Sequence, residues 1–271
     1  ISFFFNSHNG FLEEIAKFRA AREIWAKIMK NRFNVSDEKA MLCRFHVQTG
    51  GSTLTAQQVE NNIARTTIQA LSAVLGGAQS LHTNSFDEAL ALPTINSAKI
   101  ALRTQQIIAH ETGITNYVDP LANSEQVQEL TKKMIDDVRY ILEEVDSKGG
   151  AIDAIKDGWI QDEISNSSYK FQQSIDAKEK IVVGLNKYIE DEEIDINLQK
   201  IEENALKKQL AEIKNLKNNR DNAEVKNKIN SLELCTQTNE NLMPKIIDAA
   251  RAECTLGEIS DAMRRSFGEY K

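Results

Sequence analysis

The stretch "RFHVQTGGSTLTAQQ", Arg44 to Gln58, decides the predicted fold. It begins as a short strand-like run that carries a histidine and a glutamine. A Gly-Gly pair then opens a polar turn in front of a segment with helical periodicity. The stretch "GGAQSLHTNSFDEALALP", Gly76 to Pro93, repeats this order further along the chain. Strand, polar turn and helix in this order predict β/α units.

Working outward, strand-like runs alternate with helices over the first 118 residues. The predicted strands cover 1–5, 44–49 and 78–84, and the predicted helices cover 10–32, 54–77 and 97–113. The pair Gly76–Gly77 suits the end of the second helix, and Gly113 suits the end of the third. This alternation predicts an α/β fold built on a parallel sheet.

From Ser124 onward the chain reads as mostly helical. The predicted helices cover 125–147, 149–157 and 160–177, and after a short apolar run at 180–186 helix continues to the end. A helical stripe of Leu206, Leu210, Ile213 and Leu216 is broken near 218–222. We favour a solvated helical pair that packs one face on the body over a partner-binding coiled coil, because the stripe is shorter than three to four heptads.

Composition limits the class of protein. The 271 residues are 41% hydrophobic and 27% charged, which is enough for one large domain or two modest ones. The net charge of −7, with scattered basic residues, argues against a nucleic-acid partner. Cys43, Cys235 and Cys254 are too few and too far apart for a disulfide framework or a zinc site, so we interpret them as buried apolar residues in a reducing compartment. No apolar run approaches the roughly 20 residues that span a bilayer, and the start of the chain has no basic signal region, so we expect an interior piece of a longer protein.

The candidate site lies at the carboxyl ends of the predicted strands, where parallel α/β folds bind ligands. Polar side chains fall at or near these ends, namely His46, Gln48, Gln79, His82 and Asn84. Because side chains alternate along a strand, His46 shares a face with Gln48, and Ser80 shares one with His82 and Asn84, whereas Gln79 faces the other way. Amides and neutral imidazoles suit a large, amide-rich ligand, and Gly50–Gly51 permit its close approach.

The histidines leave several roles open. For His46 and His82 we weigh structural hydrogen bonding against direct ligand contact. Metal ligation is the least favoured role, because no carboxylate or cysteine completes a ligand set, and we predict no metal site. His8 and His110 read as a loop residue and a helix-surface residue.

These residues also carry a resemblance to a known family. Four segments resemble the large subunit of the methylmalonyl-CoA mutase family, namely "ISFFFNSHNGFLEEIAKFRAAREIWAKIM", "RFHVQTGGSTLTAQQ", "HTNSFDEALALPT" and "SAKIALRTQQIIAHETGITNYVDPLANS". The members of this family are adenosylcobalamin-dependent acyl-CoA mutases. The resemblance runs through essentially the whole chain and is strongest over 1–122. After "DPLA" this chain has Asn123 to Gln126 where the family usually has Gly-Ser-Tyr-Phe.

The resemblance implies a fold and a function. Residues 1–118 would be the last three β/α units of a TIM-type (β/α)8 barrel that binds acyl-CoA. Residues 119–271 would be a helical region that wraps the barrel and leads to a cobalamin-binding domain, whose Asp-x-His-x-x-Gly signature this chain lacks. The implied reaction is a radical carbon-skeleton isomerisation, with (R)-methylmalonyl-CoA to succinyl-CoA favoured. An isobutyryl-CoA or ethylmalonyl-CoA mutase and a non-catalytic partner subunit are the alternatives. The chain alone would be inactive.

The resemblance also implies site residues and partners. Ser2 matches a serine that contacts coenzyme A, and Gly51, Glu88 and Ala91 match positions that touch the cobalamin. Polar residues of the barrel mouth correspond to Gln48 and Asn84 on the cofactor side and to His46 and Gln79 on the substrate side. Adenosylcobalamin is the expected cofactor. The expected partners are acyl-CoA, a cobalamin-binding domain or subunit and a like or related subunit in a dimer, with no membrane. The expected compartment is the cytoplasm, or the mitochondrial matrix in a eukaryote.

Overall fold

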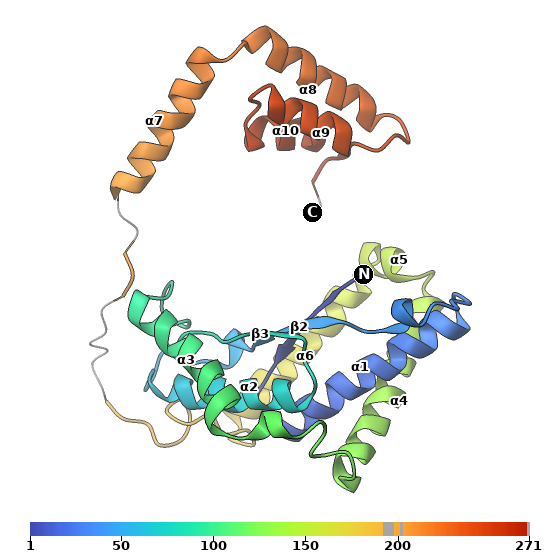
Figure 1. The fold of residues 1–271 in the computed structure, drawn as a ribbon, viewed down its shortest axis with the longest axis vertical. Helices are drawn as coiled ribbons and strands as arrows, with labels where there is room; N and C mark the ends of the chain where they lie inside the picture. The colour runs from blue at the N-terminus through green and yellow to red at the C-terminus, as the bar shows by residue number, and fades with distance from the viewer. Residues whose placement is uncertain (192–197, 201–202, 270–271) are drawn as a thin grey trace. The chain divides into compact units, whose positions relative to one another are not determined.

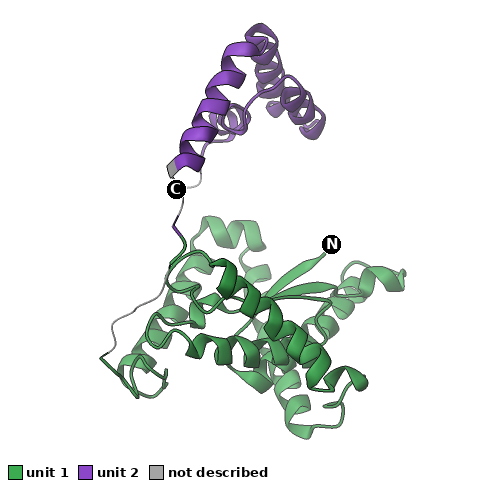
Figure 2. Ribbon diagram, turned by 60° about the vertical axis from the view of Figure 1, so that its left-hand side comes forward, with its two compact units in different colours: residues 1–199 green, residues 200–271 purple. Residues whose placement is uncertain are grey.

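The computed structural model describes residues 1–191, 198–200 and 203–269. The chain folds as two compact units, 1–199 and 200–271 (Figure 2). The boundary that the resemblance implied after residue 118 falls inside the first of these units. There, helix α4 (Glu125–Ser147) packs along helix α1 (Phe11–Asn31).

Three parallel strands form the sheet of the first unit (Figure 1). They are β1 (Phe3–Ser7), β2 (Phe45–Thr49) and β3 (Ser80–His82), in the order β1-β2-β3. Helix α1, helix α2 (Asn61–Leu75) and helix α3 (Ile95–Glu111) each follow one strand. The predicted alternation of strand and helix, and the parallel sheet, are confirmed.

The two faces of the sheet lie in different surroundings. One face is buried against α1 and α2, where Phe18 of α1 stacks on Phe45 of β2 with ring centroids 5.4 Å apart. Val47 of β2 and Ala73 of α2 belong to the same core. On the other face Phe4 is 61% exposed, so this side of the sheet is called the open face below. Strand periodicity alone assigns each side chain to one of the two faces.

Helix α2 begins later than predicted. The sequence placed its start at Leu54, but Gly51–Thr53 form a 3-10 turn and the α-helix starts at Asn61. The side chain of Asn62 explains the difference, because its Oδ1 accepts from the Thr55 backbone N–H at 3.1 Å and its Nδ2 donates to the Thr55 carbonyl at 2.8 Å. An asparagine that bonds the backbone in this way stabilises a turn in competition with a helix.

The end of α2 follows the prediction. Gly77 has a φ of +81°, and its N–H donates to the Val74 carbonyl at 3.0 Å. The Ala78 N–H donates to the Ala73 carbonyl at 3.1 Å. These two bonds form a Schellman motif, which needs a residue in the left-handed region and therefore favours glycine. They turn the chain directly into β3.

Further helices complete the first unit. The 3-10 turns are Glu38–Met41 and Ile114–Asn116, and the helices are α4, α5 (Ala151–Lys156) and α6 (Trp159–Asp176). Ser124 caps α4, since its hydroxyl accepts from the Val127 N–H. The segment after α6 returns to α2 and the loop before it, where Arg65 of α2 donates to the Val183 carbonyl at 2.7 Å and Gln58 of the loop donates to the Tyr188 carbonyl at 2.8 Å.

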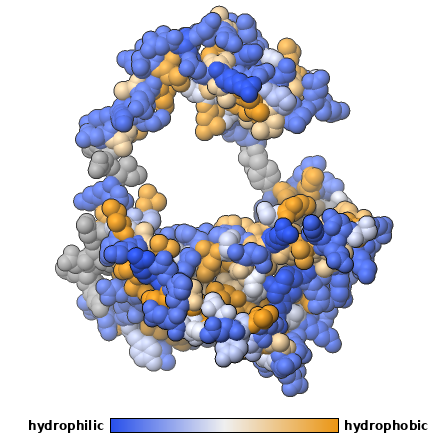
Figure 3. Space-filling view, viewed as in Figure 1, coloured by the Kyte–Doolittle hydropathy of each residue, from blue (hydrophilic) through white to orange (hydrophobic). Residues whose placement is uncertain are grey.

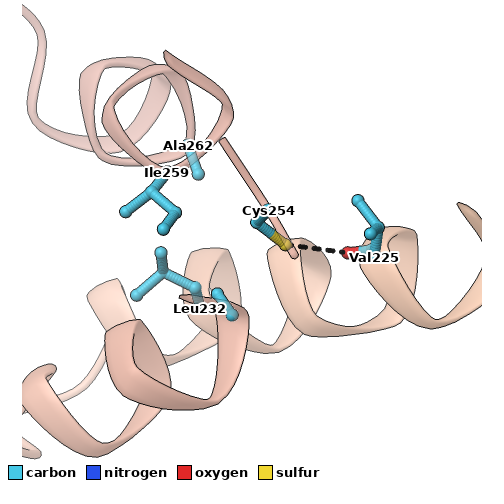
Figure 4. Close-up of a cluster of buried hydrophobic side chains, with 6 residues drawn as sticks. Val225, Leu232, Cys254, Ile259 and Ala262 are labelled. Atoms are coloured by element: carbon cyan, nitrogen blue, oxygen red, sulfur yellow. Dashed lines mark hydrogen bonds between the residues drawn. The ribbon is translucent and has the colours of Figure 1, made fainter. Parts of the chain in front are cut away.

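The second unit is helical. It contains α7 (Glu203–Asn219), α8 (Asn222–Thr236), α9 (Met243–Arg251) and α10 (Leu256–Phe267). Figure 4 shows the core between α8 and α10, where Leu232 faces Ile259 and the Cys254 thiol lies 3.9 Å from the Val225 carbonyl oxygen. The predicted break near 218–222 is confirmed, because Asp221 caps α8.

The predicted packing of the apolar stripe of α7 is not settled in the same way as the break. Leu206 and Leu210 are exposed, at 61% and 58%, so α8 to α10 do not cover this part of the stripe. Exposed apolar side chains occur in both units, and orange patches mark apolar residues on the visible face in Figure 3. The predicted packing of this helix on the body stays a prediction.

The cysteines match their predicted role. All three are buried and free, and burial raises the pKa of the Cys43 and Cys254 thiols. A thiol that resists ionisation is a poor nucleophile, so Cys43 and Cys254 serve packing. Of the helices in the described part of the chain, none has the length and apolar character to cross a membrane.

An ion pair fixes the start of α10 and makes the second unit sensitive to acid. Glu258 closes a capping box with Thr255, and Arg220 donates to its carboxylate at 2.7 Å. The Arg220 guanidinium lowers the pKa of Glu258 from 4.5 to about 2. This stabilisation is therefore complete above pH 4.5 and disappears as the pH falls towards 2.

We predict that Glu258→Gln lowers the free energy of local opening of α10 at neutral pH by about 2 kcal/mol, allowing for solvent screening. Hydrogen exchange of α10 peptides measures this loss, and the difference from the wild type should shrink between pH 4.5 and 2. Glu212→Gln, in an exposed pair with Lys208, is the matched control and should have little effect. Equal protection of α10 in both variants would contradict the prediction.

Candidate functional site

The open face carries two rows of side chains across the sheet. The strand register places Phe4 beside His46 and His46 beside Ser80 in one row. Towards the carboxyl end, the second row contains Asn6, Gln48 and His82, which are paired in the same way. The predicted shared face of His46 and Gln48, and of Ser80 and His82, is confirmed, because they alternate with buried residues in β2 and with the half-buried Leu81 in β3. Asn6 was missed, although the two-residue period of β1 would have placed it here.

The first row is held by direct contacts. The Nδ1 of His46 lies 2.7 Å from the Ser80 hydroxyl, and its ring lies 4.9 Å from the ring of Phe4. This hydrogen bond fixes the ring orientation and leaves Nε2 for another partner. His46 thus has both a structural bond and a nitrogen that is open to a ligand.

Asn84 does not continue the open face. Strand β3 ends at His82. Asn84 follows it, is only 2% exposed and lies at the carboxyl end of the neighbouring strand β2. Its Oδ1 accepts from the Thr49 hydroxyl at 2.5 Å, and its backbone N–H donates to the same hydroxyl oxygen at 2.9 Å. The predicted shared face of Asn84 with Ser80 and His82 is therefore wrong, because strand alternation ends with the strand.

Buried polar atoms without a protein partner gather just after β3. In the described part of the chain they include Nδ2 of Asn84, Oγ of Ser85 and Oδ1 of Asp87, all within four consecutive residues. A buried polar atom without a partner costs about 1–3 kcal/mol, so such a group is typical of a binding site. A pocket of about 190 Å³, lined by His82, Ser85, Glu88 and Gln105 among others, opens here.

Gly51 forms the wall opposite Asn84. A Cβ added to Gly51 would lie 3.3 Å from Asn84 Nδ2 and 3.6 Å from Glu88 Oε1. Glu88 itself is exposed. It lies in a turn, not in the first turn of a helix, and its backbone N–H donates to the Ser85 carbonyl. Ala91 closes the same turn by donating to the Asp87 carbonyl at 3.1 Å. We call Gly51, Asn84 and Glu88 the cradle, because the absence of a side chain at Gly51 lets these two side chains pack against its backbone.

Ser2 and Gln79 lie at the other end of the sheet. Ser2 is exposed and comes just before β1. Gln79 comes just before β3, where its Oε1 accepts from the Phe45 N–H at 2.7 Å and its Nε2 donates to the Gly77 carbonyl at 2.9 Å. The expected position of Gln79 near the carboxyl ends is wrong, because this residue directly precedes β3 and so lies at the amino end of the strand.

Gln69 holds the loops that form the site, and the sequence analysis missed it. It is fully buried on α2, its Oε1 accepts from the Gly50 N–H at 2.9 Å, and its Nε2 donates to Asn9 Oδ1 and Thr53 Oγ1 at 2.6 and 2.7 Å. The loops after β1 and β2 therefore meet at one amide. A glutamine four residues before the core residue Ala73, on the apolar face of a helix, was the available signal.

The comparisons with known proteins agree over the whole chain. Residues 1–269 match the sequence model of the family described as methylmalonyl-CoA mutase. This chain belongs to the methylmalonyl-CoA mutase family. The resemblance first seen in the sequence is thereby confirmed.

Its curated relatives in the family are longer proteins. The 2-hydroxyisobutanoyl-CoA mutase large subunit of Aquincola tertiaricarbonis is 41% identical over 273 residues, covering 100% of this chain and 49% of the relative. The probable mitochondrial methylmalonyl-CoA mutase of Caenorhabditis elegans and the methylmalonyl-CoA mutase of Rhizobium meliloti are each 42% identical over 100% of this chain, which covers 36% and 38% of them. The chain thus spans half or less of the length of these relatives.

We predict that Gln69→Met loosens both loops of this mutase-family site. The substitution keeps the side-chain volume but removes the bonds to Gly50, Asn9 and Thr53, which costs about 2 kcal/mol of local stability. Hydrogen exchange of peptides covering 45–55 measures this loss. Gln106→Met, on the exposed side of α3, is the matched control and should stay within about 0.5 kcal/mol of the wild type. Unchanged exchange in Gln69→Met would show that the amide does not hold the loops.

Proposed function

We propose that this chain is part of an adenosylcobalamin-dependent acyl-CoA mutase that rearranges the carbon skeleton of its substrate. The reaction that we favour converts (R)-methylmalonyl-CoA into succinyl-CoA. The observation that carries the proposal is the set of buried, unpartnered polar atoms of residues 84–87 beside Gly51. A large ligand with many polar groups would satisfy these atoms.

The cradle fits the polar periphery of a cobalamin. Asn84 Nδ2 would donate to a ligand oxygen, Glu88 would accept from ribose hydroxyls, and Gly51 and Ala91 would allow close approach of a bulky group. When bound, adenosylcobalamin supplies the radical chemistry of the rearrangement. The chain's own residues bind and orient the partners and keep water away from them.

The open face suits the acyl-CoA. Phe4 offers an apolar surface and His46 Nε2 offers a hydrogen bond, while Gln48, the next residue of β2 on this face, lies on the cofactor side. Ser2 and Gln79 mark the amino end of the sheet, where the rest of the coenzyme A would pass. In this proposal the three β/α units are the last three of a (β/α)8 barrel, and the open face is turned towards the barrel axis.

Two alternatives belong to the same family. The first is a related substrate, such as isobutyryl-CoA or ethylmalonyl-CoA, or the 2-hydroxyisobutanoyl-CoA that the name of one relative gives. The second is a non-catalytic partner subunit. The unpartnered polar atoms favour a working site, because a subunit without a ligand would leave them permanently unsatisfied.

The proposal has consequences for assembly and location. A cobalamin-binding domain or subunit must face the carboxyl ends of the strands, and we expect a dimer with a like or related subunit. The chain alone should be inactive. We expect the protein in the cytoplasm, or in the mitochondrial matrix if the source is a eukaryote, as the names of the nematode and mouse relatives indicate for those proteins.

The direct test assays the assembled enzyme with adenosylcobalamin and (R)-methylmalonyl-CoA and follows succinyl-CoA. Isobutyryl-CoA, ethylmalonyl-CoA and 2-hydroxyisobutanoyl-CoA are assayed in parallel to decide which thioester is the substrate. An assembled protein that binds no adenosylcobalamin and converts none of these esters would overturn the proposed function.

We predict that Gly51→Ala weakens adenosylcobalamin binding about tenfold or more, because its methyl group would lie 3.3 Å from Asn84 Nδ2 and fill the cradle. Absorbance titration of the cofactor measures the dissociation constant. Gly257→Ala, whose Cβ would meet only Thr255 Oγ1 at 4.0 Å, is the matched control. Wild-type affinity in Gly51→Ala would place the cofactor elsewhere.

We also predict that His46→Ala lowers turnover more than His110→Ala does. His46 lies on the open face with one ring nitrogen bonded to Ser80, whereas His110 lies exposed in the last turn of α3. The ratio kcat/KM measures the loss, which we expect to be about tenfold or more for His46→Ala. If the two variants lose equally little, His46 does not face the substrate.

A further inference from the structure

We propose that the Thr49 hydroxyl is the group that orients the Asn84 amide, so that this side chain presents only hydrogen-bond donors to the cradle. Thr49 would thus be a positioning residue for the cofactor, acting through Asn84. This inference deepens the proposed function and rests on it. It also defines the ligand atom opposite Asn84 as an acceptor, an oxygen or an unprotonated nitrogen.

The hydrogen bonds around Thr49, together with their lengths, favour one arrangement of the Asn84 amide. The backbone N–H of Asn84 can only donate, and it donates to the Thr49 hydroxyl oxygen at 2.9 Å. The hydroxyl keeps its own proton, which needs an acceptor. The Asn84 side-chain atom lies 2.5 Å away, a separation in the range of an O–H···O bond and shorter than an N–H···O bond, so it is the carbonyl oxygen Oδ1 and the NH₂ group is at the other end of the amide.

Burial makes this arrangement decisive. Thr49 is 0% exposed and Asn84 is 2% exposed, so water does not compete for these bonds. The Nδ2 at the other end of the amide is buried, has no partner in the described part of the chain and lies 3.3 Å from the position of a Gly51 Cβ. If the amide turned over, Oδ1 would enter the cradle, facing the Glu88 carboxylate whose Oε1 is 3.6 Å from that same position. Thr49 thus keeps a donor, not a second acceptor, beside Glu88.

The strand supplies the precision that this role needs. Thr49 is the last residue of β2, pairs with Ser7 of β1 and points to the helix-covered face. A β-branched side chain in a strand has few rotamers, so its hydroxyl is held in place before a ligand arrives. The loop that carries Asn84 then takes its orientation from the sheet.

The test replaces the hydroxyl without changing the shape. Thr49→Val removes the hydrogen bonds and keeps the volume, whereas Thr49→Ser keeps the hydroxyl and loses only a methyl group. We expect Thr49→Val to raise the dissociation constant of adenosylcobalamin in the assembled mutase about tenfold, and Thr49→Ser to restore most of the affinity. The dissociation constant for the acyl-CoA should stay within about twofold, because Thr49 faces away from the open face.

Thr66→Val is the matched control. Thr66 is also a buried threonine, at 2% exposure, but its Oγ1 has no hydrogen-bond partner in the described part of the chain. Its replacement removes no bond and should leave cofactor affinity unchanged. If Thr49→Val does not fold, Thr49→Ala is used instead in every experiment. It removes the same hydroxyl without adding a methyl group.

A double-mutant cycle separates orientation from simple stability. If Thr49 acts through Asn84, then Thr49→Val has no further effect on cofactor affinity in an Asn84→Ala background. Additive losses would mean a general structural effect and would overturn the inference. A crystal structure of Thr49→Val gives a readout that needs no cofactor, since the Asn84 amide should leave its position beside Gly51.

The outcomes distinguish the two proposals. If Asn84→Ala weakens the cofactor and Thr49→Val does not, the orientation role is wrong while the proposed function stands. If the wild type binds no adenosylcobalamin, the proposed function fails, and Thr49 then has no role towards that cofactor. In that case the crystal structure still decides whether Thr49 orients the amide.

Discussion

A single buried amide, that of Gln69, determines where the loops of the candidate site lie. Loops at strand ends have no ladder of their own, so their positions depend on side chains that reach them from the scaffold. Gln69 reaches from α2 to Asn9 after β1 and to Gly50 and Thr53 after β2. Because one buried amide is hydrogen-bonded to residues of both loops, the positions of the two loops depend on each other.

The sheet separates stability from function by its two faces. Phe18, Phe45 and Val47 pack on the helix side, and this apolar contact holds the β/α units together. Asn6, Gln48 and His82 lie on the open face, where their exchange costs little core energy. Such a division leaves the site free to vary in chemistry while the scaffold stays constant.

The carboxyl end of the sheet combines two kinds of polar group. Those that hold the loops, such as Thr49 and Gln69, are buried and fully bonded within the chain. Those that face the cradle, such as Asn84 Nδ2 and Ser85 Oγ, are buried without a partner. This contrast distinguishes supporting residues from ligand-facing ones more clearly than residue type does, because amides occur in both groups.

The sequence by itself determined the order of the elements, the parallel α/β class, the faces of the regular strands and the family. These features are local or repeated, because strand periodicity and the glycines that end α2 and α3 act within a few residues of the chain. The tertiary structure alone decided where regularity stops. Asn84 leaves the open face to meet Thr49, Gln79 joins the amino end of β2, and Gln69 reaches two loops from a helix face that reads as apolar. Each of these bonds joins residues at least 19 positions apart, and no local propensity encodes the partner of a side chain at that separation.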